Sequence, residues 1–237
     1  MTRWAIALAF GIAVLAGPGC GSGTGDAPPA PNTLTDEERA AGWRLLFDGT
    51  TTEGWRGFRS NAMPAGWQAV DGALTRVAEA GDIVTVDVFE DFELAFDWKI
   101  SPGGDSGVLF RVTEDVEAAW NAGPEYQILD NAAHQEGLKP ETSAGADYAL
   151  HPPFRDATRP PGDWNEGRIV VNGNHVEHWL NGEKIVEYEI GSDDWTARVG
   201  ASKFAPFPNF GRVRRGRIAI QDHGNEVAYR NLKIRSR

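Results

Sequence analysis

The sequence has little of what crosslinks small proteins or builds metal centres. Its 237 residues contain one cysteine, Cys20, so no disulfide can form within the chain. Five histidines are scattered along the sequence and match neither a zinc-finger nor an HExxH spacing. No dense block of Lys and Arg offsets the formal net charge of −11, which argues against nucleic acid as a partner and against a bare anionic membrane surface. With 41% hydrophobic residues, the chain must be stabilised by the core of one full-sized domain.

The apolar run at the N-terminus is too short for a permanent transmembrane helix. It covers residues 4–16, about 13 residues, whereas a membrane span needs roughly 20. Arg3 precedes the run and small residues follow it, which is typical of a secretory signal. The placement of Cys20 after Gly17-Pro18-Gly19 resembles a bacterial lipoprotein signal, in which the cysteine is lipid-modified. We therefore predict a signal peptide over residues 1–19, lipidation at Cys20, and export as a membrane-anchored lipoprotein facing the periplasm or cell surface, with simple secretion as the alternative.

The composition changes twice before the folded domain begins. Residues 20–34 are rich in Gly, Ser and Pro and show no apolar period, which predicts a flexible tether. Thr35 and Glu38 then have the spacing of a capping box, which predicts a short helix that runs through Ala41 and ends at Gly42. We expect almost no other helix, and one domain over residues 35–237.

From Trp43 onward, apolar and polar residues alternate, with turn signals about every 8 to 12 residues, a pattern typical of an all-β sandwich or barrel. Residues 92–100 show one core face, and Asn181-Gly182 favours a type I′ hairpin. We expect about ten to thirteen antiparallel strands. The segment between Asn131 and Trp164 lacks the alternation and contains several prolines, so it is predicted to be a functional loop or a packed cover.

Several residue types that catalysis uses lie in or just after the expected strands. They are Arg111, Glu125, Gln127, Asp130, Lys203, Gln221, Asp222 and His223. Singly, each could be an ordinary solvated side chain, and His223 could equally cap its strand or act as an acid or base. Together, they offer hydrogen bonds for a polyol, a general base, and a cation for developing oxyanion charge. Trp120 and Trp164 lie in expected loops, where an aromatic ring can cover a sugar.

Eight sequence blocks, in this order, resemble one known family. They are Phe47-Asp48-Gly49 with Trp55, WQAVDGAL from Trp67, DSGVLFR from Asp105, GPEYQILD from Gly123, Trp164-Asn165, HWLNG from His178, GRIAIQDHG from Gly216, and RNLKI from Arg230. Over residues 43–236 the chain resembles the 3-keto-disaccharide hydrolase domain family. The resemblance implies a concanavalin A-like (jelly-roll) β-sandwich of two antiparallel sheets, and cleavage of glycosides already oxidised to a ketone at C3.

The implied chemistry agrees with the residues present. A C3 ketone acidifies the C2 proton, so a base can remove it, the aglycone leaves from C1, and water adds back. Carried over to this chain, the resemblance points to His223, Glu125 and Lys203 as catalytic residues. It points to Arg111, Gln127 and Asp222 as substrate-binding residues, to which the positions of polar and aromatic residues in the sequence add Asp130, Trp120, Trp164 and Gln221. No cofactor is required for this chemistry, although Glu125, Asp130, Asp222 and His223 could hold a divalent metal.

Two other functions stay open at this point. The same fold hosts lectins, so the chain could be a non-catalytic carbohydrate-binding surface lipoprotein. A conventional retaining glycosidase is disfavoured, because Glu125 to Ile128 supplies one carboxylate and one amide where that chemistry needs two carboxyl groups about 5 Å apart. In every case carbohydrate is the expected partner, and the membrane is reached only through a lipid anchor.

Overall fold

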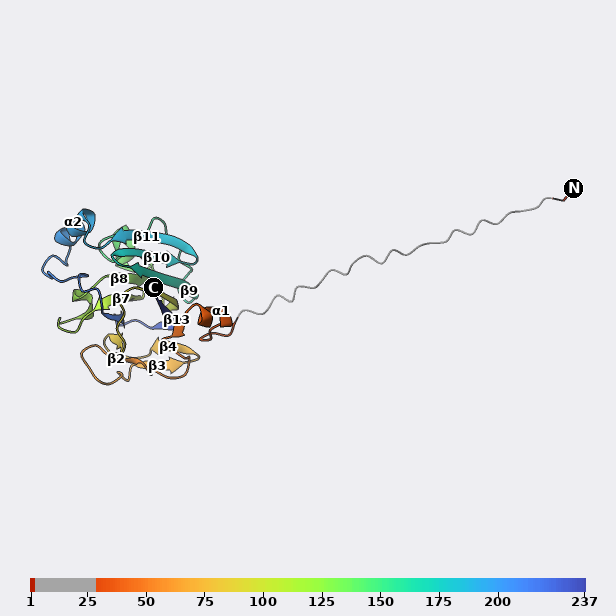
Figure 1. Ribbon diagram of the computed structural model, residues 1–237, viewed down its shortest axis with the longest axis horizontal. Coiled ribbons are helices and arrows are strands. Elements are labelled where there is room, and N and C mark those ends of the chain that lie inside the picture. Colours follow the sequence, from red (N-terminus) through yellow and green to blue (C-terminus); the bar gives the residue numbers. More distant parts are fainter. Residues whose placement is uncertain (3–28) are drawn as a thin grey trace.

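Two antiparallel sheets stacked on each other form the folded part of the chain (Figure 1). The computed structural model describes residues 1–2 and 29–237. Cys20, and the predicted signal peptide apart from its first two residues, lie outside the described residues. Within the described residues, no helix is long and apolar enough to cross a bilayer. The architecture is the all-β, concanavalin A-like sandwich that the sequence led us to expect, and that prediction is confirmed.

Eight strands form the larger sheet and five form the smaller one. Along the larger sheet the order is β11 (Glu183–Glu189), β10 (His175–Leu180), β9 (Asn165–Asn172), β6 (Phe92–Ile100), β13 (Val227–Ser236), β4 (Ala73–Arg76) and β3 (Trp67–Val70), with β1 (Arg44–Leu45) paired to β13. The smaller sheet has the order β2 (Trp55–Gly57), β5 (Ile83–Thr85), β12 (Arg217–Ile220), β7 (Asp105–Val112) and β8 (Glu125–Leu129). The described strands number thirteen, at the upper end of the expected range.

The main core lies between the sheets and is built by the predicted alternation. In β6, every second residue from Phe92 to Ile100 is buried in this core, with Trp98 only 1% exposed. Val108, Phe110 and Tyr126 approach from the smaller sheet, and the Phe96 and Tyr126 rings meet edge to face with centroids 5.5 Å apart. Burial of these large side chains is the main stabilising contribution to the fold.

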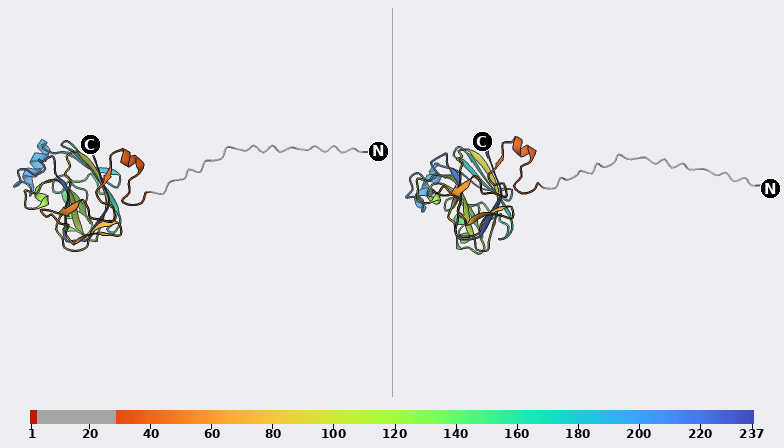
Figure 2. Two further views of the ribbon diagram at one scale, coloured as in Figure 1. Left: turned by 60° about the horizontal axis from the view of Figure 1, so that its bottom comes forward. Right: turned by 90° about the horizontal axis from the view of Figure 1, so that it is seen from below.

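The two α-helices lie on different sides of the sandwich (Figure 2). The first, α1 (Asp36–Ala40), begins at Thr35 with the predicted capping box complete. The second, α2 (Asp193–Ala201), was not expected. Ser192 caps it, but Trp195 is its only buried residue, so the segment carries almost no apolar period that sequence reasoning could detect.

The folded domain begins earlier in the chain than predicted. Asn32, which we expected in a flexible tether, is 8% exposed. Its backbone N–H donates to the Asn231 side chain at 2.7 Å, and the Asn231 N–H donates back to the Asn32 side chain at 2.8 Å. Because Asn231 belongs to β13, the chain enters the domain against the larger sheet.

The long segment between Asn131 and Trp164, which we call the insert, is a packed cover, as expected. It contains two 3-10 turns, η2 (Gln135–Leu138) and η3 (Pro140–Thr142). Further on, residues 145–148 run beside β8: Gly145 N–H donates to the Gln127 carbonyl at 2.8 Å, and Tyr148 N–H donates to the Glu125 carbonyl at 3.0 Å. The insert therefore covers the free edge of the smaller sheet.

Candidate functional site

The face of the smaller sheet that is turned away from the larger one, which we call the outer face, collects the polar residues of β7 and β8. Val108 and Phe110 point into the main core, so their neighbours point outward. One end of the outer face is apolar and ends at Leu109, which belongs to a second small cluster. The polar part begins beside it: on β8, Glu125 lies opposite Leu109, and Gln127 lies opposite Gly107. Strand register thus places a carboxyl and an amide side by side on this face.

Glu125 is buried without a hydrogen-bond partner for its carboxyl group. It is 5% exposed, and no side chain or backbone group among the described residues hydrogen-bonds its carboxyl group. The pKa of Glu125 is raised to about 8, mainly because the group is buried; the nearby Asp105 carboxylate adds to the rise and the Lys203 ammonium opposes it. Gly107 leaves room for this carboxyl, since a Cβ there would lie 2.1 Å from Glu125 Oε1.

Lys203 comes to the same place from the segment that follows α2. Its ammonium lies over the rings of Trp120 and Tyr148, 4.8 and 4.3 Å from their centroids. Trp120 belongs to the 3-10 turn η1 (Ala119–Asn121). Burial lowers the pKa of Lys203, and attraction to Glu125 opposes that shift. Aromatic faces hold the cation while leaving its N–H groups free for a ligand oxygen.

Asp105, the first residue of β7, faces two histidines. His223 Nδ1 lies 3.5 Å from Asp105 Oδ2, and His134 Nε2 lies 3.8 Å from the same oxygen. The other oxygen, Oδ1, accepts a 3.1 Å hydrogen bond from Gln127 Nε2. Burial raises the pKa of Asp105, and the two histidines oppose the rise. The side-chain amide oxygen of Gln127, Oε1, is buried with no protein partner among the described residues, so it is free to accept a hydrogen bond from a ligand.

Six of the residues predicted from sequence come together here: Glu125, Gln127, Lys203, Trp120, Gln221 and His223. Gln221 continues the outer face from β12, because its backbone N–H donates to the Gly107 carbonyl at 3.0 Å. His223 is half exposed and borders an open groove lined by Arg76, Glu79, Gly81 and Asp222. His223 therefore lies at the solvent-exposed margin of this group.

Arg111 does not reach this site. Its φ of +58° places it in a bulge of β7, where the pairing with β12 slips by one residue. The side chain, 1% exposed, donates to the carbonyls of Gly211 and Gly173 instead. Gly173 lies in the turn between β9 and β10, so this guanidinium ties the smaller sheet to the larger one.

Three further predicted residues also lie apart from Glu125. Asp222 accepts from Arg76 Nε at 2.6 Å and from the backbone N–H of Ala80 and Gly81, which fixes the turn before His223. Asp130 accepts from the N–H groups of Gly103 and Ala132 and closes the loop before β7. Trp164 lies over the larger sheet, where the guanidinium of Arg230 is 4.1 Å from its ring centroid.

Sequence reasoning missed three members of the site. Asp105 shares the parity of Gly107 and Leu109, so the alternation of β7 could have identified it. His134 and Tyr148 come from the insert, where no alternation exists to predict a direction. Their positions follow from the backbone pairing of residues 145–148 with β8, which only the structure reveals.

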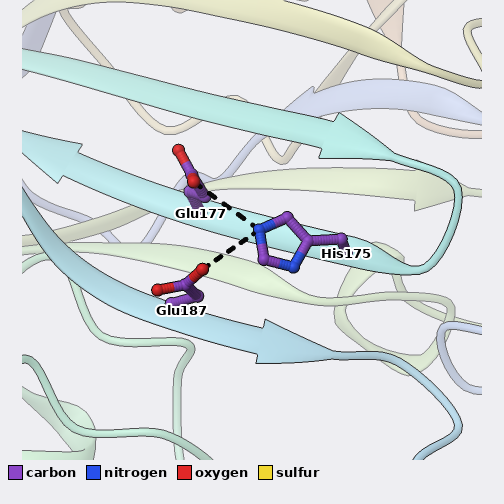
Figure 3. A group of neighbouring side chains, drawn as sticks. All are labelled: His175, Glu177 and Glu187. Carbon is purple, nitrogen blue, oxygen red and sulfur yellow. Dashed lines mark ion pairs between the residues drawn. The ribbon is translucent and has the colours of Figure 1, made fainter.

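The metal candidates do not form a group. Among the described residues, three potential ligands within 4.8 Å of one another occur only at His175, Glu177 and Glu187 on β10 and β11 (Figure 3). Glu125, Asp130, Asp222 and His223 are not such a group. Lys184 Nζ already lies 3.3 Å from Glu177 and 2.7 Å from Glu187, so ordinary ion pairs account for the surface cluster.

Comparison with known proteins gives a consistent result. A family model described as a 3-keto-alpha-glucoside-1,2-lyase-like domain matches residues 42–235. A 3-keto-disaccharide hydrolase of Bacteroides thetaiotaomicron is 31% identical over 228 residues, which cover 83% of this chain and 79% of that protein. Crystal structures of two candidate glycosyl hydrolases of Parabacteroides distasonis are also similar. The first is 37% identical with a TM-score of 0.82, and the match covers 88% of this chain and 100% of that chain. The second is 31% identical with a TM-score of 0.66, and the match covers 82% of this chain and 99% of that chain.

Proposed function

This chain belongs to the family of 3-keto-alpha-glucoside-1,2-lyase-like domains and is a carbohydrate-cleaving enzyme, and we propose that its substrates are 3-keto-glycosides, cleaved by elimination and hydration. In the first half, the C2 proton leaves, a C1=C2 double bond forms, and the aglycone departs from C1 with the bonding electron pair. In the second half, water adds at C1 and a proton returns to C2. The product is a free 3-keto sugar.

The observation that carries this proposal is the buried Glu125 carboxyl beside a cation. A base works best when its pKa lies near the working pH, and the pKa of Glu125, about 8, meets that condition. Burial favours the neutral acid that forms once Glu125 has taken the C2 proton. One carboxyl group in this environment suits proton abstraction next to a ketone better than it suits two-carboxylate glycosidase chemistry.

Lys203 and His223 complete the reaction. The Lys203 ammonium, held over Trp120 and Tyr148, stabilises the enolate oxygen that develops at C3. His223, whose Nδ1 faces Asp105, acts as the acid that donates a proton to the departing aglycone oxygen. Because His223 borders the open groove, we place the aglycone there. Gln127 and Gln221 bind sugar hydroxyls.

The test uses the purified protein and two chromogenic substrates, p-nitrophenyl 3-keto-glucoside and its unoxidised parent. We expect nitrophenol release from the keto compound only. In D2O the 3-keto glucose product should carry deuterium at C2, because the proton removed there is replaced from solvent. Direct hydrolysis at C1 would leave C2 undeuterated once exchange of the free product has been subtracted. His175→Gln, which changes a histidine of the larger sheet away from the site, is the control variant and should release nitrophenol as wild type does.

Two outcomes oppose the proposal. Turnover of the unoxidised glucoside at a similar rate would indicate a conventional glycosidase. Saturable sugar binding without any product, unaffected by Glu125→Gln, would indicate a non-catalytic binding protein.

A further inference from the structure

A buried histidine outside the site links the two segments that supply Lys203 and Tyr148. His151, in the insert, is 8% exposed. Its Nδ1 lies 2.7 Å from Asp147 Oδ2, and its Nε2 lies 3.0 Å from Asp194 Oδ2. Asp147 belongs to the insert and Asp194 to α2, so one imidazole ring bridges the insert and the helix.

The ring is held by aromatic neighbours as well as at its nitrogens. Tyr188 of β11 stacks on it with centroids 4.8 Å apart and planes 5° apart, and Trp195 of α2 lies 6.0 Å away at 15°. The charged and titratable neighbours are Asp147 from the insert, Asp194 and Arg198 from α2, Tyr188 from β11 and, beyond it, His178 from β10. With a carboxylate oxygen at each nitrogen, the ring donates on both sides when it is an imidazolium.

Each end of this bridge leads along the chain to a residue of the site. Asp147 directly precedes Tyr148, whose backbone N–H is bonded to the Glu125 carbonyl. Asp194 is the second residue of α2, which ends at Ala201, two residues before Lys203. The Lys203 ammonium lies 4.3 Å from the Tyr148 ring. The insert and the α2 segment are therefore joined twice, once through His151 and once through this cation–π contact.

We propose that His151 is a positioning residue, which joins the insert to α2 through Asp147 and Asp194 and thereby fixes the Lys203 ammonium next to Glu125. As far as catalysis is concerned, this inference rests on the proposed function; its structural part, the placement of Lys203, does not. Loss of the Asp194 carboxylate removes this bridge and also releases Arg198, whose Nη1 donates to the Leu150 carbonyl of the insert at 2.8 Å. The start of α2 can then shift away from the insert and draw Lys203 from its place, while β8, which carries Glu125, is untouched. Misplacement of a catalytic group by about 1 Å can cost about 100-fold in rate.

The test exploits two adjacent acidic residues in the first turn of α2. Asp194→Ala removes the contacts of one exposed carboxylate with His151 and with Arg198 Nε, 3.0 and 2.8 Å long, so the variant is expected to fold. Asp193→Ala removes a neighbouring exposed carboxylate and the same favourable charge at the helix N-terminus, and it serves as the matched control. We expect Asp194→Ala to lower kcat about 10- to 100-fold with KM within twofold, and Asp193→Ala to stay within twofold of wild type in both. Asp194→Asn keeps an acceptor oxygen for His151 and should restore most of kcat.

A second measurement needs no substrate. The rate at which Lys203 is acylated by acetic anhydride, followed on its peptide by mass spectrometry, should rise several-fold in Asp194→Ala but not in Asp193→Ala. In the Lys203→Met background, adding Asp194→Ala should change kcat no further, because the bridge acts through that lysine. Equal acylation rates in the two aspartate variants would overturn the inference. Faster acylation in Asp194→Ala, in a protein that turns over no keto-glycoside at all, would uphold the placement of Lys203 and reject the proposed function.

Discussion

On the outer face of the larger sheet, the buried Glu93 and the partly buried Asp97 have cationic partners, whereas the buried Glu125 on the outer face of the smaller sheet has none within hydrogen-bonding reach. Glu93 lies 3.0 Å from Arg168 and 2.9 Å from Arg235, and Asp97 lies 3.0 Å from Arg230. Paired charges satisfy one another and leave little for a ligand. A buried carboxyl without a partner is available to react, at a cost in stability.

The largest expected effect separates these two carboxyl groups. Glu125→Gln removes the base and should lower kcat on a 3-keto-glycoside about 1,000-fold, within the range for loss of general base catalysis. Glu93→Gln leaves two arginines without their partner, so it should lower the unfolding free energy by about 1–3 kcal/mol and leave kcat unchanged. Steady-state kinetics and urea unfolding on both variants measure this. Equal activity losses would mean that the contrast between the two faces has no catalytic meaning.

Lys203→Met should have the next largest effect, about 100-fold in kcat, because the enolate loses its cation. The pH profile sharpens the test. The Lys203 ammonium lowers the pKa of Glu125, so its removal raises that pKa and moves the acidic limb of kcat/KM, expected near pH 8, to higher pH. That limb belongs to Glu125, Lys203 and Asp105 as a coupled group. An unmoved limb would indicate that a different residue titrates.

A third prediction concerns how the unfolding free energy depends on pH through Glu125. Glu125 in the folded chain keeps its proton up to about pH 8, whereas in the unfolded chain it loses it near 4.5. The folded state therefore binds more protons between these values, and this group makes the unfolding free energy fall as pH rises. Glu125→Gln removes that fall and should be more stable than wild type at pH 8.5, by a few kcal/mol at most, and little changed at pH 4.5. Thermal unfolding at the two pH values measures the difference, and a variant less stable than wild type at pH 8.5 would contradict it.

The smallest expected effect compares two tryptophans. Trp120→Ala removes one ring that holds Lys203 and should raise KM or lower kcat several-fold, on the scale of one cation–π contact. Trp164→Ala removes a ring that contacts Arg230 over the larger sheet and should leave both constants within twofold. A larger loss in Trp164→Ala would place substrate on the larger sheet.

The sequence predicted those parts of the molecule that obey a period. The core face of β6, the capping box of α1 and the outward parity of Glu125 and Gln127 all follow from local rules. The position of the Arg111 side chain could not be predicted in this way. A bulge with positive φ changes its direction, and the residue types around it do not indicate the shift in strand register. The sequence also did not predict the positions of Tyr148, His134 and α2. Their segments have no repeating apolar pattern, so long-range contacts alone set these positions.

The reciprocal hydrogen bonds between Asn32 and Asn231 have a consequence for how the molecule is presented. Pro29, Ala30 and Pro31 line a groove on the larger sheet together with Asp97 and Trp179, so the polypeptide enters the domain on the face remote from Glu125. A surface that held the chain through the predicted lipid on Cys20 would therefore lie on the side of the larger sheet. The smaller sheet would then stay open to substrate.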